Sequence, residues 1–522
     1  MINRLTILCL FLFLVQTIYS QDAGIPFAVE MEEITYDDWP GLHSFSFAEW
    51  DEYWVFIGGR RNGLHGFFTL TGFPESEAND QLWVMDRASG EYWSYSVLDF
   101  PDEWRDFLRG TNPQYVQLGQ YLYIVGGYGK DNTTGEFVTF DYLAAIDLSV
   151  LVPAVIAGGS PLSAFRMIHD PRMKVCGGEI HELGDKLYLF GGHDFNGLYN
   201  QLGNPTFTQE YTSEIREFRI DDDGINMAIV DYVAVPDPEF HRRDLSFTPA
   251  MTVDGQPALA AFGGVFKPDA DEAYLHPIYI SQDMIEIDGA YNQKMSQYTC
   301  PVAPLFDETN QLQYYLFFGG ISLHFQDEAT QMLVEDPLMP FIDEVTAFVR
   351  YPNGSTEEFV LSTKFDELLG ANAKFIPASN VPSYENGVVQ YDELSGRTLL
   401  GYIFGGIRAA IPNITPSSAS NRLFEVYATV PLATGEPPAM DDLVHVFPNP
   451  SGGVLTIKTS PDFSPTGLSL LDARGMEVLT MRGEKETMFD RLRSQWSHLS
   501  SGIYFLHLRD DKQVVVRQLI RW

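Results

Sequence analysis

Six short apolar segments, each followed directly by two glycines, recur between residues 53 and 406. Each segment has four or five mostly apolar residues, often aromatic, as expected for a strand buried on both faces. The segments are residues 53–57, 121–125, 187–190, 259–262, 314–318 and 401–404, and the glycine pairs begin at Gly58, Gly126, Gly191, Gly263, Gly319 and Gly405. We expect the glycines to end each strand where the backbone turns tightly or packs closely. This pattern, with a fixed end and variable spacing, predicts six repeats of one β-unit.

A strand, a turn and a further strand follow each glycine pair. In the first unit the strand is residues 79–86, the turn is 87–90, and Trp93 lies at the start of the next strand. This order resembles the kelch repeat, and the resemblance covers roughly residues 25–432. It implies an all-β fold, a six-bladed kelch-type β-propeller with four-stranded blades. Kelch propellers serve as binding modules and, in galactose-oxidase relatives, as enzymes.

The sixth unit ends after its third strand, residues 422–430. Residues 27–34 offer an extended, partly apolar segment before the first unit begins. We expect this segment to become the outer strand of the last blade. Such pairing would close the ring and remove exposed strand edges.

The last eighty or so residues carry a second β-rich pattern. Its landmark residues are Pro448, Asn449, Pro450, Gly453, Asp472, Gly475, Gly502 and Tyr504. The pattern resembles the type A C-terminal sorting domain of type IX secretion, found on exported Bacteroidetes proteins. The resemblance implies a small immunoglobulin-like β-sandwich that the type IX secretion machinery recognises and a sortase removes. An ordinary adhesive domain that stays in place is the alternative.

The start of the chain has the layout of a secretory signal peptide. Arg4 precedes an apolar stretch from residue 5 to 15, and Ser20 offers a cleavage point. The stretch is shorter than the about 20 apolar residues that span a bilayer, so we expect no transmembrane segment in the mature chain. The predicted domains are a signal peptide at 1–20, the propeller at 21–432, a linker at 433–441 and the sorting domain at 442–522. The protein is expected to be secreted or held on the outer-membrane surface.

The charge of the chain is strongly acidic and unevenly distributed. Asp and Glu total 71 against 33 Lys and Arg, for a formal net charge of −38. Residues 441–522 contain 10 acidic and 10 basic residues, so the whole excess lies in the preceding cargo. Such a surface repels nucleic acid and anionic lipid. Solubility outside the cell explains the excess, and cationic partners or multivalent cations are alternatives.

The long loops of the six units are expected on one face, where rigid scaffolds usually carry function. The residues predicted to bind a ligand there are Arg60, Arg61, Tyr128, Arg172, His193, Asp194, Arg242, Arg243, His324 and Arg408. Basic and aromatic groups converging at one mouth predict a site for an anion, a carboxylate or a glycan. Alternatively, the arginines pair with neighbouring carboxylates between blades.

Signals of catalysis are weak. The sequence has no GxSxG, HExxH or phosphate-loop motif. A galactose-oxidase-like copper site needs a Cys cross-linked to a Tyr, but Cys176 and Cys300 fall in predicted inner strands, where we expect them to be small buried hydrophobes. The Asp-rich segment 221–224 fits a hairpin turn better than a calcium site.

The sequence therefore predicts a non-catalytic binding module for a glycan or protein ligand. We assign no catalytic residue, no metal ligand and no cofactor, with calcium left open. A carbohydrate-active enzyme on the same face and a structural adhesion protein are the alternatives.

Overall fold

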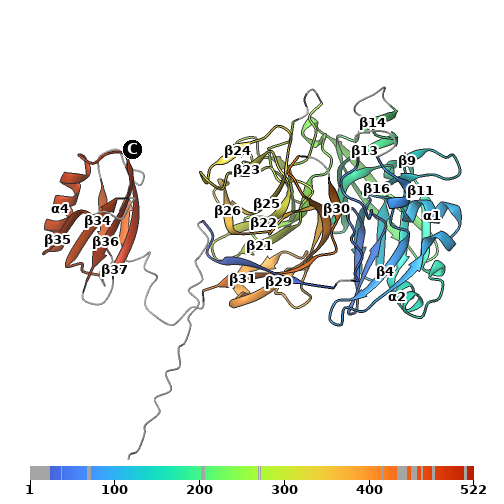
Figure 1. Ribbon diagram of the computed structural model, residues 1–522, viewed down its shortest axis with the longest axis horizontal. Helices are drawn as coiled ribbons and strands as arrows, with labels where there is room; N and C mark the ends of the chain where they lie inside the picture. Colours follow the sequence, from blue (N-terminus) through green and yellow to red (C-terminus); the bar gives the residue numbers. More distant parts are fainter. Residues whose placement is uncertain are drawn as a thin grey trace, which may run out of the picture. The chain divides into compact units, whose positions relative to one another are not determined.

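The chain divides into two compact units, Met1–Pro431 and Leu432–Trp522. The computed structural model describes residues 24–36, 38–66, 72–200, 206–268, 270, 272–413, 416–431, 444–447, 455–459, 463–472, 477–510 and 514–521 (Figure 1). The signal peptide expected at residues 1–20 and the linker expected at 433–441 lie outside these ranges. Within them, no helix is long and apolar enough to cross a membrane.

The first unit is built from antiparallel sheets. Among the described residues, six sheets follow one another in chain order, each with four antiparallel strands at its centre. They are sheet one, β2 (Ser46–Trp50), β3 (Tyr53–Ile57), β4 (Gln81–Asp86) and β5 (Tyr92–Ser96); sheet two, β6 (Gln114–Leu118), β7 (Tyr121–Val125), β10 (Tyr142–Asp147) and β11 (Phe165–His169); sheet three, β12 (Cys176–Leu183), β13 (Lys186–Gly197), β15 (Glu214–Asp222) and β16 (Met227–Pro236); sheet four, β17 (Ser246–Met251), β18 (Pro257–Phe262), β19 (Ile278–Ile280) and β20 (Ile285–Ile287); sheet five, β21 (Val302–Asp307), β22 (Leu312–Ile321), β25 (Phe341–Arg350) and β26 (Thr356–Lys364); and sheet six, β27 (Leu368–Pro377), β29 (Gly396–Ala409), β31 (Leu423–Val430) and β1 (Ala28–Ile34).

Short elements decorate these sheets. The additional strands are β8 (Tyr128–Lys130), β9 (Phe137–Thr139), β14 (Phe207–Tyr211), β23 (His324–Gln326), β24 (Leu333–Glu335), β28 (Val389–Gln390) and β30 (Ser417–Ala419). The helices are α1 (Asp102–Leu108) and α2 (Leu148–Ile156), with 3₁₀ turns η1 (Glu75–Glu77), η2 (Val97–Asp99), η3 (Leu162–Ala164), η4 (Pro171–Met173), η5 (Pro238–Phe240) and η6 (Tyr391–Glu393). The Asp-rich segment 221–224 lies at the expected hairpin: Asp221 and Asp222 end β15, and Asp223 and Gly224 begin the turn to β16.

All six apolar segments are second strands of their sheets and are paired on both sides. In β3, β7 and β18 the strand ends directly before the glycine pair, as expected. The strands β13, β22 and β29 instead continue through the pair, so for these three the expected ending is wrong. The physical reason is that partners extend the ladder beyond the glycines: β14 pairs with the end of β13, β30 with the end of β29, and β25 with Gly320 and Ile321.

The glycine pairs place each sheet against the next one. All twelve glycines have a positive φ between 57° and 95°, which side chains other than glycine rarely adopt. A Cβ at the first glycine would also overlap a backbone carbonyl oxygen at the start of the next sheet; at Gly126, for instance, it would collide with that of Val175. The corresponding pairs are Gly58 and Gly110, Gly191 and Arg242, Gly263 and Gln297, Gly319 and Leu369, and Gly405 and Leu42. The last pair brings sheet six against sheet one.

A closed cycle of backbone hydrogen bonds joins the sheets at their first strands. One residue within each first strand, or up to three residues before it, has a left-handed backbone: Ser44, Asn112, Gly177, Asp244, Thr299 and Asn372. The N–H of each donates to the carbonyl of the equivalent residue in the preceding sheet, and Ser44 donates to Asn372, at distances from 2.5 to 3.4 Å. We call these six residues the central cycle. Asn, Asp and Gly suit this conformation, because a short polar side chain or no side chain lowers its cost.

The N-terminal strand completes sheet six. Strand β1 pairs with β31 in antiparallel register, with Ala28 opposite Thr429 and Ile34 opposite Leu423. The predicted pairing of residues 27–34 with the last unit is therefore confirmed. Phe27 is fully buried in the same core, with its ring 5.4 Å from that of Tyr314 in sheet five.

The second unit combines strands with one helix. Its elements are the hairpin β32 (Val444–Phe447) and β33 (Thr456–Thr459), the sheet β34 (Gly467–Asp472), β35 (Glu477–Arg482), β36 (Gly502–Arg509) and β37 (Val514–Arg521), and helix α4 (Lys485–Trp496). Sequence reading anticipated the strands but not α4. Its apolar residues recur at helical spacing, and Met488, Phe489, Leu492 and Trp496 are buried in one core with both the hairpin and the sheet.

We predict that Gly126→Ala destabilises the protein far more than Gly135→Ala. Both glycines have a positive φ, but a Cβ at Gly135 would meet nothing within 4 Å. The control variant, Gly135→Ala, should lower the free energy of unfolding by about 1 kcal/mol, the cost of the left-handed backbone. The overlap with Val175 should add roughly 2 kcal/mol more. Urea denaturation of the mature chain measures both, and equal losses would contradict the proposed close approach.

Candidate functional site

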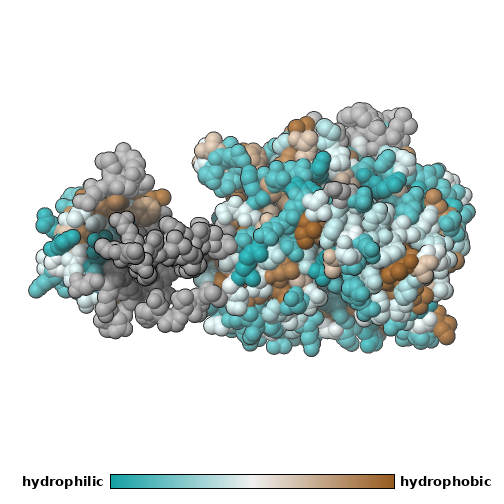
Figure 2. All heavy atoms as spheres, turned by 60° about the horizontal axis from the view of Figure 1, so that its bottom comes forward, coloured by the Kyte–Doolittle hydropathy of each residue, from teal (hydrophilic) through white to brown (hydrophobic). Residues whose placement is uncertain are grey.

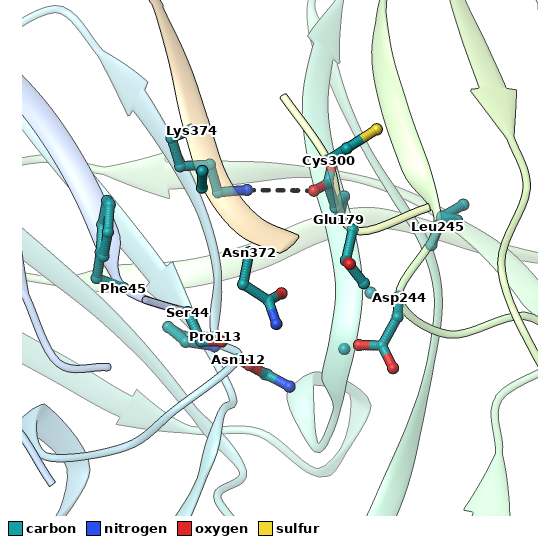
Figure 3. A pocket seen from close by; sticks show the side chains of 14 residues that line it. Ser44, Phe45, Asn112, Pro113, Glu179, Asp244, Leu245, Cys300, Asn372 and Lys374 are labelled. Carbon is teal, nitrogen blue, oxygen red and sulfur yellow. Dashed lines mark hydrogen bonds and ion pairs between the residues drawn. The ribbon is translucent and has the colours of Figure 1, made fainter. Parts of the chain in front are cut away.

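A small cavity of about 50 Å³ lies where the first strands of the six sheets meet (Figure 3). The central cycle lines it, and the side chains of Asn112, Asp244 and Asn372 point into this space. The volume has room for a few water molecules but not for a sugar. We call it the central cavity.

A cross-cavity ion pair bounds this space. Glu179 of β12 and Lys374 of β27 belong to sheets three and six, and their charged groups lie 3.2 Å apart. Lys374 also lies over the ring of Tyr115, at 5.5 Å from its centroid. Burial disfavours the charged ammonium, but the Glu179 carboxylate outweighs burial and raises the pKa of Lys374. The ammonium of Lys374 is therefore charged at neutral pH, and the pair links two sheets that are not adjacent in sequence.

A second layer of residues, which we call the mouth tier, lies next to the central cycle. It consists of the residue before each member of the central cycle and the residue after each glycine pair. In each sheet these two residues are β-bridge partners. The pairs are His43 and Arg60, Thr111 and Tyr128, Cys176 and His193, Arg243 and Val265, Tyr298 and Ile321, and Ala371 and Ile407. Polar and basic side chains come mainly from sheets one to four, and aliphatic ones from sheets four to six. The mouth tier is thus amphipathic.

The histidines of this region are held neutral. Burial lowers the pKa of His43 to about 3 and that of His65 to about 4. Burial also lowers the pKa of His193 well below its usual range, and the nearby Arg243 adds to the effect. At neutral pH these imidazoles can donate or accept a hydrogen bond, but they bring no charge.

Arg243 is a mouth-tier cation in contact with Asp244 of the central cycle. Its side chain is 19% exposed, and its guanidinium lies 5.3 Å from the ring centroid of Phe266. The Nε atom lies 3.5 Å from the Asp244 carboxylate and has no hydrogen-bond partner among the described residues. Arg243 therefore retains hydrogen-bonding capacity next to Asp244, which lines the central cavity.

A loop from sheet one covers the mouth tier. Leu64 packs in the apolar cluster that contains Ala371 and Ile407, and its N–H donates to the Ser417 hydroxyl at 2.9 Å. The adjacent His65 stacks on Phe73, with the ring centroids 5.2 Å apart. Residues 62–66 thus close the region from the loop face.

Other residues predicted for ligand binding are buried with their polar groups engaged. The Arg60 guanidinium donates to the carbonyl of Pro74 at 2.7 Å and to Asn62, and the Tyr128 hydroxyl donates to the carbonyl of Gly197 at 2.6 Å. Arg242 is fully buried; it donates to the carbonyls of Glu239, Gly263 and His276 and pairs with the Glu239 carboxylate at 2.9 Å. These three residues hold loops and sheets together.

The remaining predicted residues lie away from the central cavity. Arg172 pairs with Asp170 at 2.5 Å, Asp194 with Lys174 at 2.9 Å and Arg408 with Glu367 at 3.6 Å, whereas Arg61 is exposed and donates to the carbonyl of Ser76. His324 is half-buried in β23, with a buried Nδ1 that has no partner among the described residues. In the mouth tier the structure therefore brings together Arg60, Tyr128, His193 and Arg243 of the predicted set.

Sequence reading missed the central cycle, His43, His65 and the Glu179–Lys374 pair. The sequence does carry a signal for part of the central cycle. In the first three sheets the cycle residue lies 14 positions before the first glycine, at 44 and 58, 112 and 126, and 177 and 191. The spacing lengthens to 19, 20 and 33 in the last three sheets (244 and 263, 299 and 319, 372 and 405), which hides the equivalence.

Both cysteines are buried and unpaired, in agreement with their expected role as small hydrophobes. Burial raises the pKa of each thiol to about 12, so neither is a thiolate at neutral pH. Within the part of the chain that the structure describes, no group of three or more His, Cys, Asp or Glu is placed to hold a metal ion.

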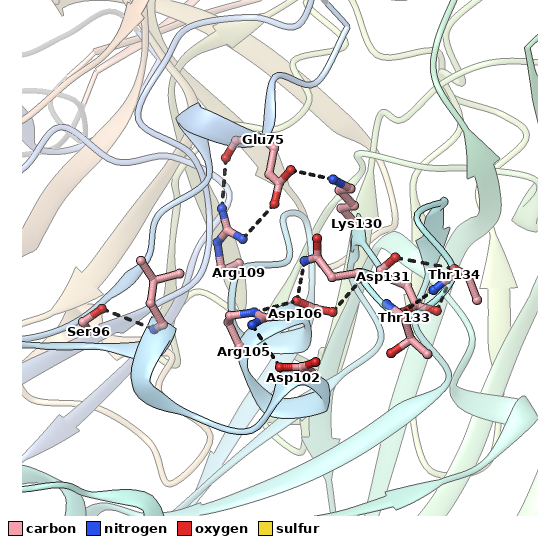
Figure 4. Close-up of polar contacts among 12 residues, drawn as sticks. Glu75, Ser96, Asp102, Arg105, Asp106, Arg109, Lys130, Asp131, Thr133 and Thr134 are labelled. Carbon is pink, nitrogen blue, oxygen red and sulfur yellow. Dashed lines mark hydrogen bonds and ion pairs between the residues drawn. The ribbon is translucent and has the colours of Figure 1, made fainter.

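Charged residues outside the mouth tier form ion-pair networks between sheets one and two (Figure 4). Glu75 pairs with Arg109 at 3.2 Å and with Lys130 at 2.8 Å, so it joins the loop of sheet one to that of sheet two. Asp106 of α1 accepts hydrogen bonds from the backbone and side chain of Asn132. Ion pairs and hydrogen bonds therefore hold this part of the loop face in place.

Comparison with known proteins identifies the C-terminal segment. The family model described as "Secretion system C-terminal sorting domain" matches residues 445–521. This domain indicates export by type IX secretion, to the medium or to the cell surface, and implies interaction with that machinery. Among solved structures, that of YjhT is similar at 11% identity and a TM-score of 0.41, covering 74% of this chain and 97% of YjhT. No curated protein matches the sequence.

Within the sorting domain the structure describes only part of the predicted motif. Gly502 begins β36, and Tyr504 in the same strand is buried and donates its hydroxyl proton to the carbonyl of Ser500 at 2.9 Å. Asp472 ends β34. The other predicted motif residues, Pro448, Asn449, Pro450, Gly453 and Gly475, lie outside the described ranges.

We predict that the Glu179–Lys374 pair contributes more to stability than an exposed pair does. Either Glu179→Gln or Lys374→Met leaves a partly buried charge without its partner, so each should lower the free energy of unfolding by about 2 kcal/mol. The double variant should lose less free energy of unfolding than the two single variants lose together. Lys267→Met, which removes the exposed partner of Glu272, should cost less than about 1 kcal/mol.

The pH dependence of this pair follows from the sign of the shift. Because the pKa of Lys374 is raised in the folded state, its contribution is complete below the pKa of an unfolded lysine, about 10.4. The contribution to stability is lost only as the pH rises through the pKa of Lys374 in the folded state. The coupling measured by urea denaturation should therefore stay constant from neutral pH to about pH 9, and a decline within that window would contradict the assignment.

Proposed function

We propose that residues 21–432 form a six-bladed kelch-type β-propeller that acts as a non-catalytic binding module outside the cell. The six successive sheets, the closed central cycle and the pairing of β1 with sheet six support this architecture. In this proposal residues 442–522 are an immunoglobulin-like sorting domain, removed by a sortase after export. The propeller is then released or retained at the cell surface.

The chemistry of the mouth tier favours binding over catalysis. A general base works best with a pKa near the operating pH, whereas the pKa values of His43 and His65 lie at about 3 and 4. A thiol with a pKa of about 12, as for Cys176, is a poor nucleophile. The groups nearest the cavity are suited to hold a ligand through hydrogen bonds and charge.

The single observation that carries the proposed ligand class is Arg243. Its largely buried guanidinium retains an unused donor beside a cavity lined by polar groups. An anionic group, such as the carboxylate of an acidic glycan, would complement it. The neutral His193 would add a hydrogen bond, and the aliphatic side of the mouth tier would contact the carbon skeleton. Residues 62–66 must move aside for such a ligand to bind.

We predict that Arg243→Gln weakens binding of a carboxylated glycan at least tenfold, since a charge-assisted hydrogen bond contributes about 1.5–3 kcal/mol. Glycan-array screening of the mature chain would identify the ligand, and calorimetry would measure the affinity. The matched control is Arg408→Gln, because Arg408 is 51% exposed and lies away from the central cavity. Binding of neutral glycans alone, or equal affinity in a folded Arg243→Gln variant, would refute the anionic ligand.

Removal of residues 442–522 should leave the protein in the periplasm, because the sorting domain is the part that the export machinery recognises. Cell fractionation with immunodetection in a type IX-competent host measures the distribution. Tyr504→Phe, which keeps the buried ring and removes only the bond to Ser500, is the control for a folded domain and should still be exported. Export of the truncated chain would contradict the proposed route.

A further inference from the structure

A larger cavity lies in the first unit beside the hairpin formed by β23 and β24. Its volume is about 730 Å³, within the range of about 300–1,000 Å³ that is typical of ligand sites. The hairpin turn, β25, β26 and the segment at Pro412 line it. We call it the hairpin groove; it is separate from the central cavity and shares no lining residue with it.

The floor of the hairpin groove is apolar. Phe341, Ile342 and Leu361 are buried side chains of β25 and β26 that line it. Two large side chains near it are unusually exposed: Met332 at 66% and Leu338 at 73%. Elsewhere, the face of the first unit drawn in Figure 2 is mostly hydrophilic, with hydrophobic residues in small separate spots. A concave surface with an apolar floor is typical of ligand sites.

The charges around the groove are predominantly negative. Five carboxylates line it, from Asp327, Glu328, Asp336, Asp343 and Glu344, and Lys364 is the one cation among the described lining residues. The Lys364 ammonium lies 2.8 Å from Glu328 and 3.2 Å from Asp343. The groove thus already binds one cation of the chain itself and retains excess negative charge.

One buried acceptor of the groove lacks a donor among the described residues. The Oδ1 atom of Asn413 is buried without a hydrogen-bond partner in the described part of the chain, while its Nδ2 donates to Asp336 at 3.0 Å. Glu344 is 7% exposed and accepts the N–H of Gln326 at 2.7 Å. Ionised carboxylates and amide oxygens can only accept. A ligand that complements this set must donate several hydrogen bonds and carry positive charge.

We propose that the hairpin groove binds an arginine side chain of a peptide segment whose neighbouring residues are apolar. A guanidinium presents several donors in a planar fork and can therefore contact Asp336 and Asn413 together, which a lysine ammonium does less well. The apolar neighbours would cover the floor and the exposed Met332 and Leu338. The acidic excess of the cargo would speed the approach of such a partner.

The test uses the full mature chain and a capped peptide of alternating leucine and arginine, with binding measured by fluorescence anisotropy. The same peptide with citrulline in place of arginine keeps the shape and loses the charge. We expect the arginine peptide to bind at least tenfold more tightly than the citrulline peptide, and its affinity to fall as salt is added. Equal affinity of the two peptides would overturn the proposal.

Two variants locate the site. Asp336→Asn should weaken the arginine peptide at least tenfold, and Glu344→Gln should also weaken it. Asp283→Asn removes the same charge at an exposed turn outside the groove and should have no effect. Equal affinity in the Asp336 and Asp283 variants, with both folded by circular dichroism, would overturn the proposal.

Two further measurements distinguish the groove from the mouth tier and a peptide from a polyamine. Arg243→Gln should leave peptide binding unchanged, so failure of the mouth-tier proposal would not affect this one. Loss of peptide binding in Arg243→Gln would overturn the assignment to the groove. Spermidine should compete only weakly, and competition as strong as that of the unlabelled peptide would replace the peptide partner by a free polyamine.

Discussion

The structure depends on the close backbone approach between consecutive sheets at the glycine pairs. Each first glycine lies against a carbonyl of the next sheet, and the N–H of Gly59, Gly127, Gly192 and Gly406 donates to that carbonyl at 2.7–2.9 Å. Only a residue without Cβ fits there, and only a positive φ directs the N–H correctly. The central cycle adds a second set of backbone bonds between the same sheets. Both sets of bonds also connect sheet six with sheet one.

This backbone framework determines what the side chains at the centre can do. Because the central cycle satisfies its own backbone groups, the side chains that line the central cavity can remain polar. Charges that do enter the centre are compensated, as Glu179 and Lys374 show. The hairpin groove differs because five carboxylates share one ammonium there. The two sites therefore favour ligands of different charge: Arg243 of the mouth tier favours an anion, whereas the acidic hairpin groove favours a cation.

The positions of the strands followed closely from the sequence, since a buried second strand needs a continuous apolar run and β3 and β7 match their predicted bounds. The pairing of β1 was predictable because the sixth unit lacked a strand. Helix α4 was not predicted, although its apolar residues recur at helical spacing, because strand patterns flank this short segment on both sides. The candidate site was only partly predicted: His193 and Arg243 were named, whereas Asn112, Asp244 and Asn372 were not.

The sequence by itself determined that the chain is all-β in its cargo, made of six repeated units, and addressed for export by its C-terminal domain. Local patterns suffice for these conclusions, because burial, turn formation and the sorting signal are encoded in short segments. Only the tertiary structure decided which polar residues face the centre of the first unit and which form hydrogen bonds that hold loops and sheets together. Arg242 and Arg243 are neighbours in sequence, yet Arg242 is fully buried among carbonyls and Arg243 lies partly exposed beside Asp244 in the mouth tier. That difference arises from how neighbouring sheets approach each other, and residues far apart in the sequence determine it.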